Sequence, residues 1–245
     1  MGDEDIFTDA WRTPRWEITS SSLERTEELR QALPELFKVL EITSILDCGC
    51  GNFVWQNAVD WTEIQYLGVD IVKPLIEELL TQHTAENINF LYRNCLTDTE
   101  ETTDLWIARD LLPTLSFAQG RQFLKRYLES QSPYLAVTSV ESSHENQDAL
   151  PGSFRWLDIK KSPYSLPEPE YCLPDGEQWR KKKFLYVYTR QQILEALALN
   201  SATVEVAPPP QPLGNQGKNA HLVSNVPLRQ MSIRDHMGSG MPYRA

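Results

Sequence analysis

Asp47-Cys-Gly-Cys-Gly-Asn-Phe-Val-Trp55 is the stretch of this chain that indicates its fold. It follows the short run Thr43–Asp47, which is typical of a β-strand, and residues 53–61 can form a helix. The two glycines, at positions 49 and 51, allow a tight turn and a close approach of the backbone to a ligand. We therefore expect a strand, a glycine turn and a helix, although a short D-x-G-x-G match also arises by chance.

Asp70 strengthens the interpretation of this turn as a nucleoside site. It ends the strand-like run Tyr66–Val69, 23 residues after Asp47, where a carboxylate can accept hydrogen bonds from both hydroxyls of a ribose. A dinucleotide site requires a third glycine and a free helix N-terminus for the diphosphate, whereas here Phe53 stands two positions after Gly51. An acid that opens the turn suits instead a cofactor with a cationic amino group, such as S-adenosylmethionine.

Strand and helix patterns alternate along most of the chain. Before the turn, a helical lead-in runs to about Leu40, opened by a capping box at Ser21–Glu24 and split or kinked by Pro34. Strands are expected at 64–72, 88–95, 104–110 and 134–140, and helices at 74–83, 117–128 and 190–199. This alternation predicts a parallel sheet covered on both faces. Two successive strands, 203–207 and 221–226, predict an antiparallel hairpin after it.

Four ordered motifs make the chain resemble the class I S-adenosylmethionine-dependent methyltransferases, and among them a bacterial and viral subgroup of which some members are tied to surface-glycan gene sets. The subgroup's D-x-P-C-G-D-F-x-W corresponds to residues 47–55, and its Y-x-G-x-D-I-V to residues 66–72. Its D-L-x-x-x-R-D-x-L-x-H-L-S corresponds to residues 104–116, and its N-x-D-x-x-x-G-x-x-R-x-x-N-L to residues 146–159. The match spans roughly residues 16–175 and is far more specific for a methyltransferase than for a substrate.

The resemblance implies an α/β, Rossmann-like class I methyltransferase fold with a seven-stranded, mostly parallel sheet, an antiparallel C-terminal hairpin and helices on both faces. It implies S-adenosyl-L-methionine as cofactor. The implied cofactor-binding residues are Asp47, Cys48, Gly49, Cys50, Gly51, Phe53, Trp55, Asp70, Ile71, Asn94, Cys95 and Arg109. The chain departs from the subgroup at three positions, because Asn52 and Asn94 replace acids and Thr114 replaces a histidine.

Two residues are candidates for catalysis. In methyl transfer the cofactor brings the electrophile, so the protein mainly positions the acceptor and takes its proton where the acceptor is a hydroxyl. Asp110 is expected at the carboxyl edge of the sheet, where it can act as base or orient the acceptor, or else cap the next helix or pair with Arg109. His144 follows the fifth strand and suits general-base work, or else is an exposed loop histidine.

Residues 142–187 interrupt the alternation and are rich in aromatic residues, which favours an ordered insertion. The resemblance places this insertion over the acceptor. Asn146, Arg155 and Trp156 are the candidate acceptor-binding residues. Arg155 offers a planar fork of donors and Trp156 an apolar face, and bracing of the loop is an equal alternative for them.

The amino-acid composition limits the classes of molecule that the chain is expected to bind. The 34 acidic residues outnumber the 23 Lys and Arg residues, and the net charge of −11 makes nucleic acid an unexpected partner. The basic run 180–183 is expected to be a solvated turn. No apolar run approaches the roughly 20 residues that cross a bilayer, and the acidic start Met1–Asp5 is unlike a signal peptide, so we expect a cytoplasmic protein without membrane contact. The four cysteines and four histidines lack metal-ligand spacing, so no metal is expected.

One methyltransferase domain is expected over residues 1–245. It comprises a helical lead-in (1–42), a cofactor-binding core (43–141), a substrate-side insertion (142–187), a C-terminal helix and hairpin (188–226) and a loose tail (227–245). The predicted reaction is O-methylation of a saccharide or another small hydroxylated metabolite. The alternatives are a methyltransferase for a protein or a natural-product scaffold, a non-catalytic methyltransferase-like binding protein, and a nicotinamide-dependent dehydrogenase. No oligomeric state is predicted.

Overall fold

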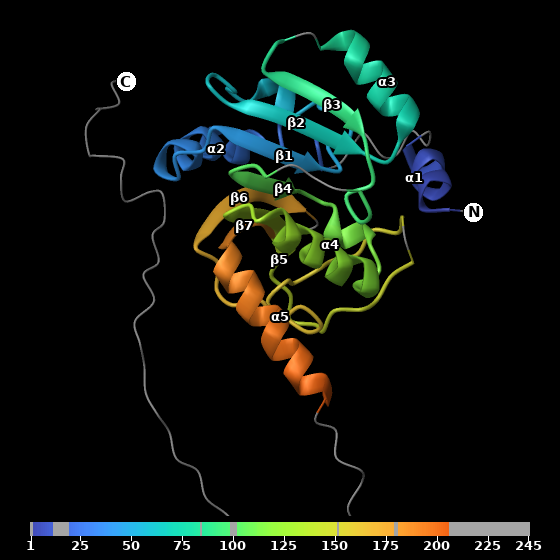
Figure 1. Cartoon of the computed structure of the whole chain (residues 1–245), viewed down its shortest axis with the longest axis vertical. Helices are drawn as coiled ribbons and strands as arrows, with labels where there is room; N and C mark the ends of the chain where they lie inside the picture. The colour runs from blue at the N-terminus through green and yellow to red at the C-terminus, as the bar shows by residue number, and fades with distance from the viewer. Residues whose placement is uncertain are drawn as a thin grey trace, which may run out of the picture.

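Strands and helices alternate in the computed structural model, which describes residues 2–11, 20–83, 85–98, 102–150, 152–178 and 181–205 (Figure 1). The helices are α1 (Asp3–Trp11), α2 (Glu27–Val39), α3 (Lys73–Gln82), α4 (Phe117–Ser130) and α5 (Arg190–Glu205), with the short 3₁₀ helices η1 (Gln56–Ala58) and η2 (Leu112–Thr114). The strands are β1 (Ser44–Cys48), β2 (Gln65–Asp70), β3 (Ile88–Tyr92), β4 (Leu105–Ala108), β5 (Tyr134–Val140), β6 (Tyr171–Gln178) and β7 (Lys181–Thr189). Strands β1 to β5 and helices α3 to α5 overlap the predicted ranges.

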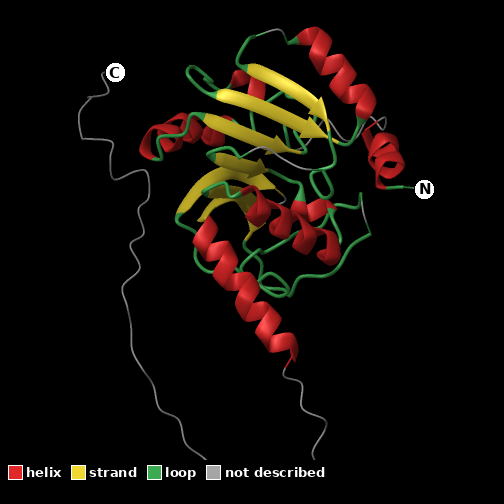
Figure 2. Cartoon of the chain, viewed as in Figure 1, coloured by secondary structure: helices red, strands yellow, loops and turns green. Residues whose placement is uncertain are grey.

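All seven strands belong to one sheet, in the order β3-β2-β1-β4-β5-β7-β6. Strands β1 to β5 are parallel, β7 runs antiparallel to β5, and β6 runs antiparallel to β7. Helices flank both faces of this sheet (Figure 2). The predicted fold class is therefore confirmed. The strand order reverses between β1 and β4, and open α/β sheets bind their ligands beyond the carboxyl ends of the strands at such a reversal.

Alternating side chains of the central strands supply two cores, one on each face of the sheet. On one face, Ile45 of β1 and Ile107 of β4 pack in the core to which α2 and α3 contribute. On the other face, Leu46 and Trp106 pack in the core to which α4 and α5 contribute. Strands buried on both faces carry short continuous apolar runs, which explains why β1 and β4 were recognisable in the sequence.

The helix predicted for residues 53–61 is wrong, because only the three-residue η1 forms there. Phe53 has a left-handed backbone conformation (φ +57°), which an α-helix cannot contain. The Trp61 indole donates a hydrogen bond to the carbonyl of Gln56, at 2.8 Å. Phe53, Trp55 and Trp61 are all buried, so compact aromatic packing covers the part of the sheet where a helix was expected.

The predicted helical lead-in is present as α2, but its predicted start is wrong. Helix α2 begins after Thr26 without a side-chain cap, so Ser21–Glu24 is not its capping box. Pro34 lies inside α2 and does not split it. Leu29, Leu33 and Leu36 bury one face of the helix, and such tertiary packing holds a helix together through an unfavourable residue.

The antiparallel hairpin of the described sheet is formed by β6 and β7, which is 171–189. Residues 203–205 belong to α5, while 206–226 and the predicted tail lie outside the described residues. Pro174 made the β6 segment resemble a loop, but β6 is an edge strand, where a proline need not donate to a neighbour. Among the described helices, none is long and apolar enough to cross a membrane.

Gly68 gives a test of the packing beneath the glycine turn. A Cβ at this position would stand 2.9 Å from Cδ1 of Phe90 and 3.1 Å from Sγ of Cys50. Gly68→Ala should therefore lower the free energy of unfolding by about 1–3 kcal/mol, measured by urea denaturation.

Gly2→Ala is the control, because its Cβ would meet Asp5 Oδ2 only at 4.0 Å. We expect it to change stability by less than about 0.5 kcal/mol. Wild-type stability of Gly68→Ala would contradict the close contact.

Candidate active site

The glycine turn after β1 is tied to the end of β2. Gly49 and Gly51 both adopt the left-handed conformation, with φ of +73° and +58°. The amides of Gly49 and Cys50 donate to the carbonyl of Val69, at 2.8 and 3.1 Å. The amide of Gly51 donates to Asp70 Oδ2 at 3.1 Å. Two neighbouring parallel strands thus present their carboxyl ends as one connected edge.

Asp70 is fixed at this edge by a second hydrogen bond. The amide of Val72 donates to Asp70 Oδ1 at 2.9 Å, so each carboxylate oxygen accepts one backbone hydrogen bond. Burial raises the pKa of Asp70 above its usual range, and these backbone hydrogen bonds oppose the rise. Each carboxylate oxygen has a second lone pair that can accept a ligand hydroxyl.

Asp47 lies beneath the turn and is almost fully buried. Its Oδ2 accepts hydrogen bonds from the Tyr66 hydroxyl at 2.6 Å and from Gln56 Nε2 at 2.9 Å. Gln56 also donates to the carbonyl of Cys50 at 2.7 Å, which fixes the middle of the turn. Burial raises the pKa of Asp47 to about 6, although Tyr66 and Gln56 oppose the rise. The acid therefore changes charge close to neutral pH.

A cavity of about 350 Å³ opens at the carboxyl ends of β1, β2 and β4. Asp3 and Phe7 of α1 line it too, and Figure 1 shows α1 beside the ends of β2 and β3. Hydrogen bonds from Gln119 to Asp3 and from Tyr92 to Glu4, both at 2.7 Å, hold α1 over this edge.

Ten of the twelve predicted cofactor-binding residues line this cavity. They are Asp47, Gly49, Cys50, Gly51, Trp55, Asp70, Ile71, Asn94, Cys95 and Arg109. The other two, Cys48 and Phe53, are fully buried in the two cores of the sheet. Phe53 packs its ring against Tyr66 and Phe90, with centroids 5.1 and 4.9 Å away, so its place is in the core and not in the cavity lining.

Asp110 lines the cavity directly after β4 and keeps a left-handed conformation, with φ of +60°. Its amide donates to Oγ1 of Thr138 at 2.7 Å. Its Oδ2 accepts a hydrogen bond from Lys183 Nζ at 2.6 Å and lies 3.6 Å from Nη1 of Arg109. The predicted pairing with Arg109 is thus present, and a lysine from the hairpin joins it.

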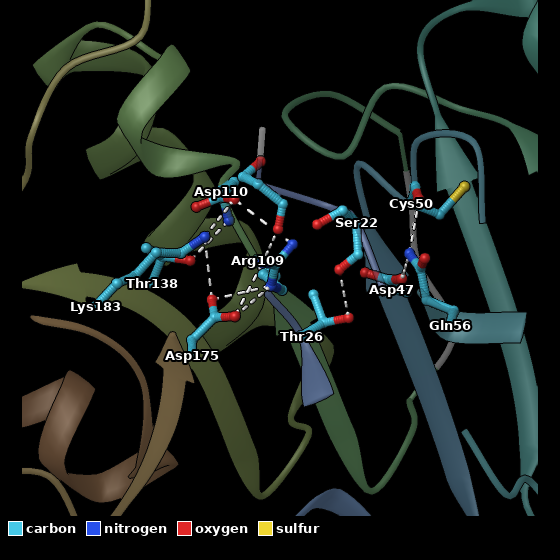
Figure 3. Close-up of polar contacts among 11 residues, drawn as sticks. Ser22, Thr26, Asp47, Cys50, Gln56, Arg109, Asp110, Thr138, Asp175 and Lys183 are labelled. Atoms are coloured by element: carbon cyan, nitrogen blue, oxygen red, sulfur yellow. Dashed lines mark hydrogen bonds and ion pairs between the residues drawn. The ribbon is translucent and has the colours of Figure 1, made fainter. Parts of the chain in front are cut away.

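Arg109, Asp110, Asp175 and Lys183 form a buried charge cluster (Figure 3). Asp175 accepts two hydrogen bonds from Arg109 Nε and Nη2 at 2.9 Å, and its Oδ2 lies 3.1 Å from Lys183 Nζ. Burial raises the pKa of Asp110, but the charges of Lys183 and Arg109 outweigh this and hold it below its usual range. Two cations and two carboxylates therefore balance one another, and Asp110 is ionised at neutral pH.

The basic run 180–183 is not simply the solvated turn that was expected. Lys182 is exposed, but Lys183 is only 2% exposed and belongs to the charge cluster. Successive side chains of a strand point to opposite faces, so one lysine of the run points inward. No group of three or more His, Cys, Asp or Glu side chains suited to a metal ion occurs in the described part of the chain.

The other predicted site residues do not line the cavity. His144 is exposed, and Asn146 donates from its amide to the carbonyls of Asp158 and Ser162, both at 2.8 Å. Arg155 donates to the carbonyl of Leu115 and stacks over the ring of Phe117. Trp156 packs edge-on against Phe154, and it is Phe154 that lines the cavity. The contacts of Asn146 and Arg155 match the alternative in which these residues brace the loop.

Four polar residues that hold the charged groups of this site were not predicted from the sequence: Gln56, Tyr66, Asp175 and Lys183. Tyr66 carried a signal, because a tyrosine in a buried strand requires a partner for its hydroxyl and Asp47 was expected on the neighbouring strand. Asp175 and Lys183 carried none, since they lie in segments interpreted as a loop and a solvated turn.

Comparison with known proteins assigns the fold. No family model matches the chain, and no curated protein matches its sequence. Among solved structures, 1,6-didemethyltoxoflavin-N1-methyltransferase from Burkholderia thailandensis is similar, with a TM-score of 0.56 and 16% identity over 76% of this chain and 86% of its own.

Two further structures agree. They are the N-methyltransferase NodS from Bradyrhizobium japonicum WM9 (TM-score 0.54, 14% identity, 77% of this chain and 98% of its own) and the mitomycin 7-O-methyltransferase MmcR (TM-score 0.56, 14% identity, 75% and 60%). The chain thus has the Rossmann-like fold of these methyltransferases.

Lys183 tests whether the charge cluster holds the hairpin to the sheet. Lys183→Met leaves two buried carboxylates with a single cation, so we expect the free energy of unfolding to fall by about 3–5 kcal/mol. Lys182→Met, one residue away on the same strand and exposed, is the control and should change little. Urea denaturation of both variants makes the comparison, and equal stabilities would mean that the cluster does not stabilise the fold.

Proposed function

We propose that this chain is an S-adenosylmethionine-dependent methyltransferase that acts on a small organic acceptor. One observation carries the proposal: the glycine turn after β1 is hydrogen-bonded to Asp70 at the end of β2, inside a cavity at the reversal of strand order. The similar structures provide support, since two of them were solved with S-adenosylhomocysteine.

The lining residues fit this cofactor. Asp70 would accept hydrogen bonds from the ribose hydroxyls through its remaining lone pairs, and Ile71, Asn94 and Cys95 would surround the adenine. Asp47, beneath the glycine turn, would attract the cationic amino group of the cofactor's amino-acid portion. When bound, the cofactor supplies an electrophilic methyl group on a sulfonium.

A dinucleotide fits less well. Among the described residues, the glycine turn leads into η1 and not into an α-helix. A helix N-terminus is what holds a diphosphate in dinucleotide-binding turns. The carboxylates of Asp47 and Asp70 would in addition repel the diphosphate of a dinucleotide. This argues against the nicotinamide-dependent dehydrogenase.

Asp110 is the proposed acceptor-orienting residue. It follows β4, next to β1, so a molecule beside it would face the methyl group of a cofactor held at the glycine turn. In-line transfer needs this alignment more than it needs a strong base. We do not assign the reaction to His144, because it is exposed and does not line the cavity.

The apolar side chains that line the cavity narrow the class of methyl acceptor that would fit. Phe7, Leu111, Leu115 and Phe154 line the cavity. They suit a small acceptor with an apolar part, such as a natural-product ring, and suit a bare saccharide less well. Two of the three similar structures are methyltransferases named for 1,6-didemethyltoxoflavin and for mitomycin.

Calorimetric titration is the first test. We expect S-adenosylmethionine and S-adenosylhomocysteine to bind one site per chain, and NADH not to compete with them. Binding of NADH without S-adenosylmethionine would overturn the proposal. A non-catalytic binding protein would bind the cofactor yet transfer no methyl group to any acceptor in a screen that follows release of S-adenosylhomocysteine.

Asp70 is expected to determine cofactor affinity. Asp70→Ala removes a carboxylate that accepts two ribose hydroxyls, so affinity for S-adenosylhomocysteine should fall tenfold or more, which is about 1.4 kcal/mol or above. Asp60→Ala removes an exposed carboxylate and should change affinity less than about twofold. Unchanged calorimetric affinity in folded Asp70→Ala would contradict the assignment.

Cofactor affinity should also depend on pH through Asp47. Its pKa is raised to about 6, so the carboxyl group is mostly ionised at pH 7.5 and mostly neutral at pH 5, where it no longer attracts a cation. We expect affinity for S-adenosylmethionine to fall several-fold as the pH decreases between about 7.5 and 5. Asp47→Asn should bind more weakly at pH 7.5 and show a flatter pH profile, whereas an equally steep profile would assign the titration to another group.

A further inference from the structure

The cavity has two chemically different ends. Asp70 ends β2, Ile71 follows it, and Asn94 and Cys95 follow β3, and these residues form the end proposed for the nucleoside. The residues that follow β4, together with side chains from α1 and from the loop after β5, form the other end. This acceptor end includes Phe7, Ser20, Asp110, Leu111, Thr114, Leu115 and Phe154.

Carboxylates supply the hydrogen-bond acceptors at this end, whereas the donors in the lining are hydroxyls such as those of Ser20 and Ser21, and the Ser20 hydroxyl already hydrogen-bonds to Asp110. Asp110 Oδ2 is held by Lys183, while Oδ1 accepts no hydrogen bond from the described residues. The Thr114 hydroxyl donates to the carbonyl of Leu111 at 2.7 Å, so its proton is already used. Asp3, nearby on α1, adds a second carboxylate to the lining.

Arg109 is the cation nearest in sequence to this end, but its charge is balanced by Asp175 and Asp110. Nε and Nη2 donate to Asp175, Nη2 also donates to the carbonyl of Ser20, and Nη1 faces Asp110. The other guanidinium that lines the cavity belongs to Arg93, after β3, three strands away from β4 in the sheet order. An anionic acceptor would therefore meet carboxylates without a free cation, and a molecule that donates hydrogen bonds is favoured.

The ion pairs of Asp110 also limit its chemistry. A carboxylate held by a lysine and an arginine is a poor base for an aliphatic hydroxyl, which must lose its proton to become a good nucleophile. An amino group on an aromatic ring is uncharged at neutral pH and carries its own lone pair. It needs orientation and an apolar site for its ring, and both are present here.

We infer that the methyl acceptor is an uncharged amino group carried on a small aromatic ring, which packs among Phe7, Leu111, Leu115 and Phe154 and donates a hydrogen bond to Asp110. This inference rests on the methyltransferase function proposed above. During transfer a bond forms between the acceptor nitrogen and the methyl carbon, and the carbon–sulfur bond breaks with its electron pair left on sulfur. The positive charge passes to the nitrogen, which then releases its proton to solvent.

Four matched probes test this inference: 6-aminoquinoline, 6-hydroxyquinoline, 6-methylquinoline and quinoline-6-carboxylate. Their affinities are measured by fluorescence titration at about pH 7.5 with the protein saturated with S-adenosylhomocysteine. We expect the amino probe to bind about tenfold more tightly than the methyl probe, because it adds one hydrogen bond to a charged acceptor, and the carboxylate to bind most weakly. With S-adenosylmethionine, release of S-adenosylhomocysteine should be faster with the amino probe than with the hydroxy probe.

Two variants test whether Asp110 causes the preference for the amino probe. In Asp110→Leu the preference for the amino over the methyl probe should disappear, and in Asp60→Leu, which removes an exposed carboxylate that does not line the cavity, it should persist. Affinity for S-adenosylhomocysteine reports whether each variant is folded, and if Asp110→Leu does not fold, the wild-type probe series decides alone.

Tighter binding of the carboxylate, faster methylation of the hydroxy probe, or no binding of any probe by cofactor-loaded protein would each overturn the inference and leave the methyltransferase proposal intact. Failure to bind S-adenosylmethionine at all would instead overturn the proposed function.

Discussion

The structure depends on the neutralisation of one buried charge, the guanidinium of Arg109. Its side chain is only 3% exposed, and an arginine does not lose its proton in a protein. A buried charge is tolerated only when it is paired and hydrogen-bonded. Asp175 supplies the pairing from the hairpin, and Lys183 in turn balances Asp110. The charge state of the cavity wall follows from this requirement, which adds ion pairs to the backbone pairing of β5 with β7 that attaches the hairpin.

The sequence predicted those parts of the fold whose side chains obey a simple period. Strands β1, β4 and β5 are buried on both faces and appear as short apolar runs, and α3 and α4 show apolar residues at helical spacing. The failed predictions lie where tertiary contacts override local pattern. Phe53 could not be expected to take a left-handed conformation, and Pro174 made an edge strand look like a loop.

Only the half of the candidate site that follows β1, β2 and β3 was predictable from the sequence. The residues after β1, β2 and β3 come together because the carboxyl ends of neighbouring parallel strands meet at one edge, so their position follows from the strand order. No comparable rule predicts where the side chains of the loop after β5 lie. Arg155 turns to the carbonyl of Leu115, Asn146 closes the loop on Asp158, and Phe154, which no motif distinguishes, lines the cavity instead.

The hairpin has a consequence for synthesis of the chain on the ribosome. Arg109 and Asp110 emerge early, together with the parallel strands around them, but Asp175 and Lys183 emerge more than 60 residues later. Until then the nascent sheet holds a cation and an anion that lack most of their final partners, and β5 lacks a neighbour on one side. A nascent chain that ends before β7 would present β5 as an unpaired edge strand, and unpaired strand edges are prone to aggregation. Pairing of β7 with β5 covers this edge and brings Lys183 to Asp110, so the hairpin completes both the described sheet and the wall of its cavity.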